Sequence, residues 1–365
     1  MRILAIDVGT GTQDVLLFDT EKEPENALKM VMPSPTTLLA RAIGRATEAG
    51  EDLLLTGVTM GGGPCGWAAE AHLDAGYRVW ATPDAARTFN DDLEEVAARG
   101  VEIVDEAQAA ELAGGVRHLE MLDFDYDGLA RAFGVFDIDL DAVDVLAVAV
   151  FDHGAAPPGY SDRLFRFEYL AERIQAGAGL AGFAFGRDEI PARMTRLQAV
   201  ASTAPAGRPL VVMDTAPAAV LGALEDPYVR GHDEVVIANV GNMHTLAFNL
   251  REGRIAGLFE HHTGLLSREK LEELLDQLSE AKISHEVLFA DHGHGALVLD
   301  PEAALLDLVA ITGPRRGLLA DSYLLPYLAV PHGDMMMAGC WGLVRACSRV
   351  LPWTAGAIEE ALGPA

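Results

Sequence analysis

An apolar run broken by one acid and two glycines constrains this chain more than any other feature. Residues 3–19 read ILAIDVGTGTQDVLLFD, so Asp7 ends one apolar segment and Gly9 and Gly11 separate it from the next. A dinucleotide-binding turn needs a third glycine and a following helix, whereas this chain continues with Asp14 and an apolar, β-branched run. The pattern therefore predicts two strands joined by a tight turn, with the glycines leaving backbone N–H groups free to converge on an anion.

The same pattern recurs far downstream. Residues 235–249 read VVIANVGNMHTLAFN, in which Asn239 stands where Asp7 does and Gly241 stands where Gly9 does. A chain of 365 residues is long for one hydrophobic core, so two domains are expected. One such hairpin opening each half predicts a duplicated α/β architecture with a cleft between an N-terminal domain (residues 1–232) and a C-terminal domain (residues 233–365). Each domain should contain a mixed β-sheet.

These hairpins resemble the phosphate-binding hairpins of the superfamily that contains actin, sugar kinases and heat-shock chaperone ATPases. The resemblance implies duplicated actin-like (ribonuclease H-like) domains that grip Mg²⁺-ATP across the interdomain cleft. "AITGPRR" (residues 310–316) similarly resembles the adenosine loop of the superfamily, with proline in place of the usual second glycine. The cofactor-binding residues implied are Asp7, Gly9, Thr10, Gly11, Thr12, Asn239, Gly241, Asn242, Gly313 and Pro314.

Asp7 is the predicted Mg²⁺ ligand, because a carboxylate at the end of the first strand would lie beside the bound anion. The second hairpin departs from the superfamily, which commonly has aspartate at the position of Asn239. An amide orients a water molecule but adds no charge and cannot act as a base. Nucleotide binding is therefore better supported by the sequence than rapid ATP hydrolysis.

Two longer segments are similar to a narrower family. "MGGGPCGWAAEAHLDAGYRVWATPDAARTFNDDLEEV" (residues 60–96) and "PHGDMMMAGCWGLVRA" (residues 331–346) look like a prokaryotic family labelled "putative pyruvate formate-lyase activating enzyme". A radical enzyme of that activity holds an iron–sulfur cluster with the spacing C-x-x-x-C-x-x-C. The three cysteines, Cys65, Cys340 and Cys347, do not have this spacing, so the label is not supported as a description of the chemistry.

Composition excludes several partners. The formal charge is 27 − 55 = −28, and such a surface repels phosphate backbones, which argues against a general nucleic-acid binder. No apolar run reaches the roughly 18 residues of a membrane span. The sequence opens directly on a strand, without room for a signal peptide, and three cysteines do not suggest a disulfide framework. We therefore expect a cytoplasmic protein.

Asp152 is the candidate general base. It ends the apolar run VDVLAVAVFD, and open α/β sheets bind ligands at the carboxyl ends of their strands. A hydroxyl or water near the γ-phosphate needs such an acceptor, although a turn-capping aspartate fits the pattern equally well. The Gly61–Gly63 stretch is either a second anion cradle or a tight turn.

The sequence leaves three functions open. The first is an ATP-dependent phosphotransferase acting on a small metabolite, and the second is an ATP-gated activator or regulatory ATPase of a partner enzyme. The third is an enzyme on the same fold that uses histidine-bound iron or zinc. Its candidate ligands are His153, His261, His262, His292, His294 and His332, with Asp291 or Asp334 completing the set.

Three helices are also expected. Leucines at 271, 274, 275 and 278 follow Ser267 with helical spacing, which predicts an amphipathic helix with a serine N-cap. A single helix is predicted from Asp84 to Arg99. The segment DMMMAGCWGLVRACSRVL predicts a helix whose small residues pack closely on another element and which backs the nucleotide pocket.

Overall fold

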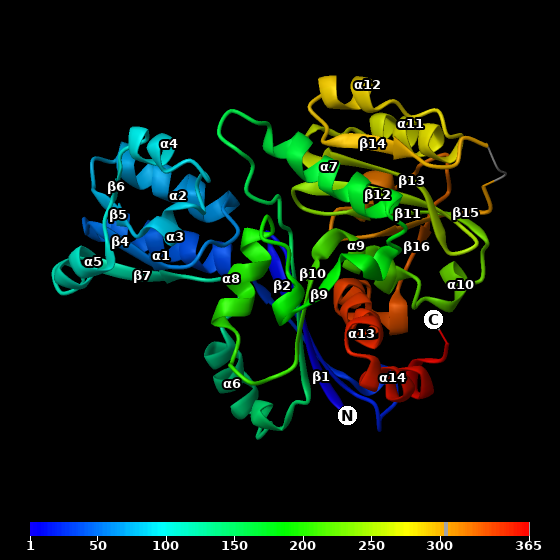
Figure 1. Ribbon diagram of the computed structural model, residues 1–365, viewed down its shortest axis with the longest axis horizontal. Helices are drawn as coiled ribbons and strands as arrows, with labels where there is room; N and C mark the ends of the chain where they lie inside the picture. The colour runs from blue at the N-terminus through cyan, green and yellow to red at the C-terminus, as the bar shows by residue number, and fades with distance from the viewer. Residues whose placement is uncertain (303–305, 365) are drawn as a thin grey trace.

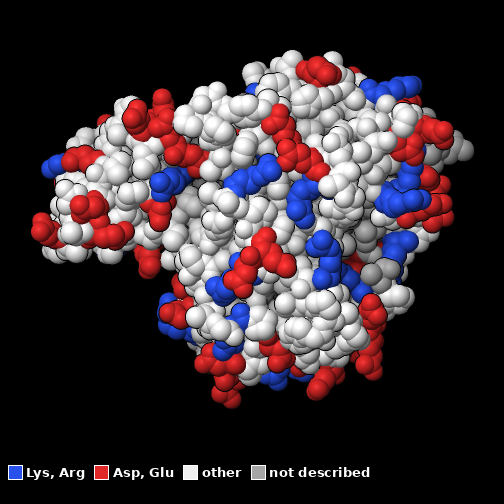
Figure 2. Space-filling model, in the orientation of Figure 1, with Lys and Arg blue, Asp and Glu red and all other residues white. Residues whose placement is uncertain are grey.

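The structure is a computed structural model that describes residues 1–302 and 306–364 and builds them around three β-sheets (Figure 1). Two six-stranded sheets form the main body, and a four-stranded sheet with its own helices lies to one side, in blue and cyan. In the part of the chain described, no helix is both long and apolar enough to cross a bilayer. Figure 2 shows acidic side chains spread over the visible face, with fewer basic ones among them.

The first six-stranded sheet begins with an antiparallel meander and continues with parallel strands. Its strand order is β3-β2-β1-β8-β10-β9, with β1, β8 and β10 parallel. Residues 9–12, here called the first turn, lie between the paired residues Val8 and Gln13 and join β1 to β2. The strands are β1 (Arg2–Val8), β2 (Thr12–Asp19), β3 (Leu28–Pro33), β8 (Val145–Val150), β9 (Ala184–Gly186) and β10 (Leu210–Asp214).

The second six-stranded sheet repeats the first five strands of this arrangement and differs in its sixth, because β9 lies beside β10 whereas β14 lies beside β13. Its order is β14-β13-β12-β11-β15-β16, in which β11, β12 and β13 form the antiparallel meander and β15 and β16 run parallel to β11. The connection at residues 241–244, here called the second turn, joins β11 to β12. The strands are β11 (Glu234–Val240), β12 (His244–Arg251), β13 (Arg254–His262), β14 (Gly295–Val298), β15 (Leu308–Thr312) and β16 (Tyr327–Leu328). The predicted duplication, with a hairpin opening each sheet, is confirmed.

The two turns have the same length and are closed by equivalent backbone hydrogen bonds. In the first, the Gly9 N–H donates to the Thr12 carbonyl at 2.9 Å, and in the second the Gly241 N–H donates to the His244 carbonyl at 3.0 Å. His244 therefore occupies in the second hairpin the place that Thr12 occupies in the first.

A parallel four-stranded sheet interrupts the first one between β3 and β8. Its order is β6-β5-β4-β7, and the sequence did not predict that these strands form a sheet of their own. The elements are α1 (Pro35–Ala49), β4 (Leu53–Gly57), α2 (Gly63–Asp74), β5 (Val79–Ala81), α3 (Pro83–Ala86), α4 (Leu93–Ala98), β6 (Val101–Ile103), α5 (Glu106–Leu112) and β7 (Arg117–Met121).

The single helix predicted from Asp84 to Arg99 is wrong. The segment forms the short helices α3 and α4, separated by a loop that includes Asn90 and Asp92. The Asn90 side chain accepts from the Asp92 N–H at 2.8 Å, and Asp92 in turn caps α4 by accepting from the Glu94 N–H at 2.9 Å. Short polar side chains of this kind bond to the nearby backbone and compete with helix formation.

Two helices rich in small residues lie between the six-stranded sheets, α9 (Thr215–Ala223) and α13 (Ala338–Val350). They cross so closely that a Cβ on Gly222 would lie 1.7 Å from the Ala338 carbonyl oxygen. A Cβ on Gly342 would lie 1.9 Å from the Ala218 carbonyl oxygen. Although α13 follows the second sheet in the chain, it packs on β1, β8 and β10 of the first. The predicted division at residue 232 falls between α10 and β11 and stays a prediction.

The remaining helices cover the outer faces. Ser267 accepts from the Lys270 N–H at 3.2 Å and begins α11, and all four leucines of the predicted amphipathic stripe are buried, as expected. These helices are α6 (Tyr126–Gly134), α7 (Asp162–Gln175), α8 (Thr195–Thr203), α10 (Pro227–Arg230), α11 (Arg268–Ser279), α12 (His285–Ala290) and α14 (Ala355–Leu362).

Candidate functional site

A cavity of about 370 Å³ lies where the three sheets meet. Both turns, the loop after β8, the turn after β15 and the N-terminal end of α13 contribute to its wall, and loops of the four-stranded sheet close the remaining side. The predicted residues that line it are Asp7, Gly9, Thr10, Thr12, Asp152, Asn239, Gly241, Asn242, Gly313 and Pro314. The structure thus brings the predicted residues together, while their roles in binding stay predictions.

The two turns touch each other across this cavity. A Cβ built on Gly11 would lie 2.7 Å from the side-chain nitrogen of Asn242, so glycine is needed for this approach. Within the described residues, the N–H groups of Thr10 and Gly11 have no acceptor in the protein, and neither have those of Asn242 and Met243. Each turn therefore leaves two neighbouring backbone donors available to an anion.

Asp7 lies at the floor of the first turn in a tightly packed position. Thr215 donates a hydrogen bond to its Oδ1, and a Cβ on Gly339 would lie 1.9 Å from its Oδ2. The pKa of Asp7 is raised to about 7. Burial is the main cause, the Thr215 hydroxyl acts against it, and the charge of Asp214 adds to it. The small residues at the start of α13 thus back the pocket, as the sequence suggested.

A second acid, Asp14, lies directly opposite Asp7 in the register of β1 and β2. Burial, followed by the charge of Asp7, raises the pKa of Asp14 to about 8. Its buried Oδ1 has no hydrogen-bond partner among the described residues. Two adjacent buried carboxylates, one with an orphaned oxygen, are suitable hard oxygen ligands for a divalent cation such as Mg²⁺. Asp14 was not predicted from the sequence, although the four-residue turn between Val8 and Gln13 pairs it with Asp7.

The turn after β15 packs directly on the second hairpin. Gly313 has a φ of +96°, and a Cβ there would lie 2.5 Å from both the Asn239 Oδ1 and the Val240 carbonyl oxygen. The Arg315 N–H donates to the same carbonyl at 3.0 Å. Gly313 is therefore required by its backbone conformation and by its neighbours, and Pro314 beside it lines the cavity.

Asp152 is a nearly fully buried part of the cavity wall, and its side chain closes a turn with Gly154. Its two carboxylate oxygens accept hydrogen bonds from the Gly154 and Leu197 N–H groups, each at 2.8 Å. Burial raises the pKa of Asp152 to about 6, although these two N–H groups and the Arg196 charge lower it. The carboxylate thus caps a turn, which was the structural alternative to a catalytic role. Its role as a base stays a prediction.

The side of the cavity formed by the four-stranded sheet carries polar groups that the sequence analysis did not single out. Residues 87–91 line it, including Arg87 and Asp91. The Gly61 N–H donates to an Asp123 oxygen at 3.2 Å, so that part of the Gly61–Gly63 stretch is occupied by a carboxylate of the protein. This observation favours the tight-turn interpretation of the stretch over the anion cradle.

The histidines predicted as metal ligands do not form one group. The His261 ring faces the Asp291 carbonyl oxygen at 3.0 Å, and His332 packs on Trp341 with ring centroids 4.3 Å apart. Of the predicted ligands, His153 and His262 do approach His294, with ring centroids 5.9 Å and 4.7 Å from that of His294.

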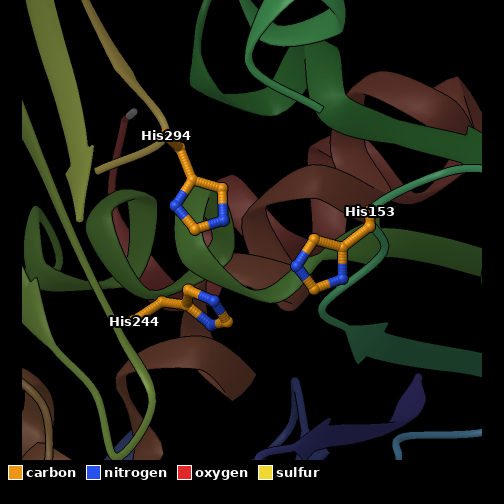
Figure 3. A group of neighbouring side chains, drawn as sticks. All are labelled: His153, His244 and His294. Carbon is orange, nitrogen blue, oxygen red and sulfur yellow. The ribbon is translucent and has the colours of Figure 1, made fainter. Parts of the chain in front are cut away.

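His244 also lies beside His294, with ring centroids 5.0 Å apart, and was not predicted from the sequence. Its place at the end of the second turn is equivalent to that of Thr12 in the first turn, and both residues line the same cavity. The equivalence of the two hairpins in the sequence could therefore have identified His244 as a cavity residue. His153, His244 and His294 form a group whose ligand atoms all lie within 4.8 Å of one another (Figure 3).

Two sheets that share the connectivity of five strands, each contributing a four-residue turn to one cavity, define a duplicated actin-like fold. The chain belongs to the family described as "Putative pyruvate format-lyase activating enzyme (DUF1786)", which matches residues 60–318. This segment includes the second turn but not the first. A search of curated proteins finds no match.

Several solved structures are similar at low identity. They include an inorganic polyphosphate/ATP-glucomannokinase from Arthrobacter sp. strain KM, with 13% identity, 100% of this chain and 99% of that chain covered, and a TM-score of 0.35. The ethanolamine utilization protein EutJ from Carboxydothermus hydrogenoformans has 12% identity, coverage of 94% and 89%, and a TM-score of 0.31. The activator of the 2-hydroxyisocaproyl-CoA dehydratase from Clostridium difficile has 10% identity, coverage of 99% and 93%, and a TM-score of 0.28. The fold assignment rests on the connectivity of the sheets and not on these matches.

The cysteines do not fit the activity in the family description. Cys65 lies on α2, and Cys340 and Cys347 lie two turns apart on α13. All three are buried, and burial raises the pKa of Cys65 to about 11 and that of Cys347 to about 12. Thiols that remain protonated and are divided between two helices do not provide the thiolate set that an iron–sulfur cluster requires.

Proposed function

We propose that this protein binds Mg²⁺-ATP between the two turns and transfers the terminal phosphoryl group to a small metabolite. The observation that carries the proposal is the contact between Gly11 and Asn242, because it brings two turns with free N–H donors to opposite sides of one cavity. A triphosphate chain lying between them would be bound from both sides. Gly313 and Pro314 lie at the same cavity and are the proposed adenosine contacts.

Asp7 and Asp14 are the residues that would hold Mg²⁺. Their donor chemistry and the orphaned Oδ1 of Asp14 fit a hard cation. When bound, Mg²⁺ supplies positive charge that offsets charge on the phosphate oxygens. The Thr215 hydroxyl, which donates to Asp7, keeps that carboxylate oriented toward the cavity.

The acceptor would lie against the wall formed by residues 87–91, opposite the two turns. Polar and charged side chains on this wall, Arg87 and Asp91 among them, suit a hydroxylated or charged metabolite. Asp152, at the carboxyl end of β8, is the proposed acceptor of the hydroxyl proton. Its two backbone hydrogen bonds leave each oxygen with further acceptor capacity.

One observation favours a second candidate, an ATP-gated activator of a partner enzyme. The second hairpin carries Asn239 where the first carries Asp7, so of the two hairpins only the first presents a carboxylate to the cavity. A site with weak activation of water hydrolyses ATP slowly, which suits a conformational switch better than a catalyst.

The binding step is tested by calorimetric titration of the purified protein with Mg²⁺ and a non-hydrolysable ATP analogue. Asp7→Asn should weaken binding at least about tenfold, because it removes charge next to the cation while keeping the shape of the side chain. Gly241→Val should abolish binding, because its Cβ would lie 2.7 Å from the His244 carbonyl oxygen and distort the second turn. Asp19→Asn, at the other end of β2, is the matched control and should bind as the parent does. Equal affinity of the parent and Asp7→Asn proteins would remove Asp7 from the site.

The two candidates separate in a turnover assay. A phosphotransferase transfers labelled phosphate from ATP to one member of a metabolite panel, and Asp152→Asn should lose this transfer while still binding ATP. An activator hydrolyses ATP slowly without any acceptor, and its rate should be insensitive to the panel.

A further inference from the structure

His153, His244 and His294 converge from three separate segments onto one space at the cavity wall (Figure 3). His153 follows β8 of the first sheet, His244 begins β12 of the second, and His294 immediately precedes β14. Their ring centroids are 5.0 to 5.9 Å apart. The group therefore spans the two halves of the duplicated fold.

The ring nitrogens of this group lack the partners that buried histidines normally have. Both nitrogens of His294, which is fully buried, and Nε2 of His244 have no hydrogen-bond partner among the described residues. Buried polar atoms in folded proteins are nearly always satisfied, so the orphaned nitrogens of His244 and His294 need an explanation. A metal ion would satisfy one nitrogen of each ring.

The backbone holds each of the three histidines in place. The His294 N–H donates to the Glu260 carbonyl at 2.9 Å, and the His244 carbonyl closes the second turn. The His244 ring also stacks on Phe151 with centroids 4.1 Å apart. His153 follows Asp152, whose carboxylate is fixed by two N–H groups. Ligands held in this way lose little freedom when they bind a metal.

The buried arginine near the group is paired with carboxylates. Arg166 is fully buried behind it, but its guanidinium is paired with two carboxylates, Asp214 at 2.6 Å and Glu260 at 2.9 Å. Glu260 also lies 3.8 Å from Nε2 of His294. The two carboxylates offset the charge of the buried guanidinium, which by itself would disfavour a cation beside the three imidazoles.

We propose that His153, His244 and His294 bind one divalent transition-metal ion, with zinc or iron(II) as the chemical class. Three imidazole nitrogens suit these metals and not Mg²⁺ or Ca²⁺, which prefer oxygen ligands. A tetrahedral site holds its nitrogens roughly 3.4 Å apart, so small side-chain rotations close the group around the ion. Because His153 and His244 line the cavity, the remaining coordination position faces it.

The experiment uses tag-free protein stripped with a chelator and then titrated with Zn²⁺, and in parallel with Co²⁺ as a spectroscopic probe. One equivalent of each should bind, and Co²⁺ should give the visible absorption of a low-coordinate nitrogen site. His294→Gln should weaken Zn²⁺ binding by at least about 100-fold, because losing a ligand costs no less than losing its supporting contacts. The matched control is His118→Gln, an exposed histidine on β7.

Circular dichroism in the presence of chelator separates loss of metal from loss of fold. If His294→Gln does not fold, His153→Gln, at the partly exposed side of the group, takes its place and should show the same loss. The proposal is overturned if the parent protein binds neither ion stoichiometrically, or if both folded variants keep the parent's affinity. It does not depend on nucleotide binding, since Zn²⁺ is titrated without ATP.

Discussion

At the scale of single residues, the pair of acids beneath the first turn is the most unusual feature. Asp7 and Asp14 face each other from neighbouring strands, and Asp214 and Asp334 are the other acids that raise their pKa values. A free carboxyl group titrates near 4, so burial without a cation keeps both groups protonated to far higher pH. Their protonation therefore depends on what occupies the site.

This dependence predicts how the stability of the metal-free protein changes with pH. The folded-state pKa values of Asp7 (about 7) and Asp14 (about 8) lie above the unfolded values. At pH values between the unfolded and the folded pKa values, the folded state therefore binds more protons than the unfolded state. Stability should therefore fall as pH rises through 7 to 8. Thermal melts in chelator between roughly pH 7 and pH 9 measure this slope, above the range where ordinary histidines titrate.

Asp14→Asn should flatten the slope, because it removes the acid with the higher folded-state pKa. Asp19→Asn should leave it unchanged. A melting temperature that rises over this range would contradict the assignment.

The sequence was sufficient to identify Asp7 and the turn glycines, because Asp-x-Gly between two apolar strands is a local pattern. Asp14 and His244 were missed for a different reason. Their places at the cavity follow from strand register and from the meeting of segments that are distant in the chain. Chemistry that depends on such pairing becomes visible only when the sheets are assembled.

At the scale of elements, the crossing of α9 and α13 controls the shape of the pocket. Gly342→Ala would place a Cβ 1.9 Å from the Ala218 carbonyl oxygen, which forces the helices apart. We expect a loss of about 1–3 kcal/mol in the free energy of unfolding. Because α13 begins beside Asp7, nucleotide affinity should fall as well.

Gly44→Ala is the matched control for this prediction, since Gly44 lies within α1 and a Cβ there would meet nothing within 4 Å. It should stabilise the protein by up to about 1 kcal/mol, because alanine favours helix. Urea unfolding of both variants provides the comparison. An equal gain in both would show that the crossing tolerates a methyl group.

Helices and strands with strong periodicity were predictable, as α11 and the two hairpins show. The split between α3 and α4 was not, because Asn90 and Asp92 compete with the helix through local hydrogen bonds. The separate four-stranded sheet was also missed. Its strands are only three to five residues long, and their pairing partners are set by packing.

At the scale of the whole molecule, Arg196 connects the four-stranded sheet to the main body. Its guanidinium donates to both oxygens of Asp123, at 2.6 and 3.0 Å, and to the Phe151 carbonyl at 2.6 Å. Asp123 is 3% exposed, so loss of this partner would leave a buried carboxylate uncompensated.

Arg196→Gln should therefore loosen this sheet and speed amide hydrogen exchange in β4 and β7 at least tenfold, with less change in β11 and β12. If phosphotransfer is found, KM for the acceptor should rise more than KM for ATP. Arg193→Gln, which breaks an exposed pair with Glu172, is the control and should alter neither. Uniform exchange across the molecule in Arg196→Gln would argue against a specific link.

The packing of α13 also has a consequence for biosynthesis. Trp341 of this helix is fully buried and meets Phe18 of β2 edge-on, with ring centroids 5.4 Å apart. The ribosome makes Phe18 early and Trp341 only after every strand of both sheets. The apolar face of the first sheet that packs on α13 therefore stays without its partner helix until the end of translation. Until α13 has been synthesised, the nascent chain must be protected from aggregation through this face.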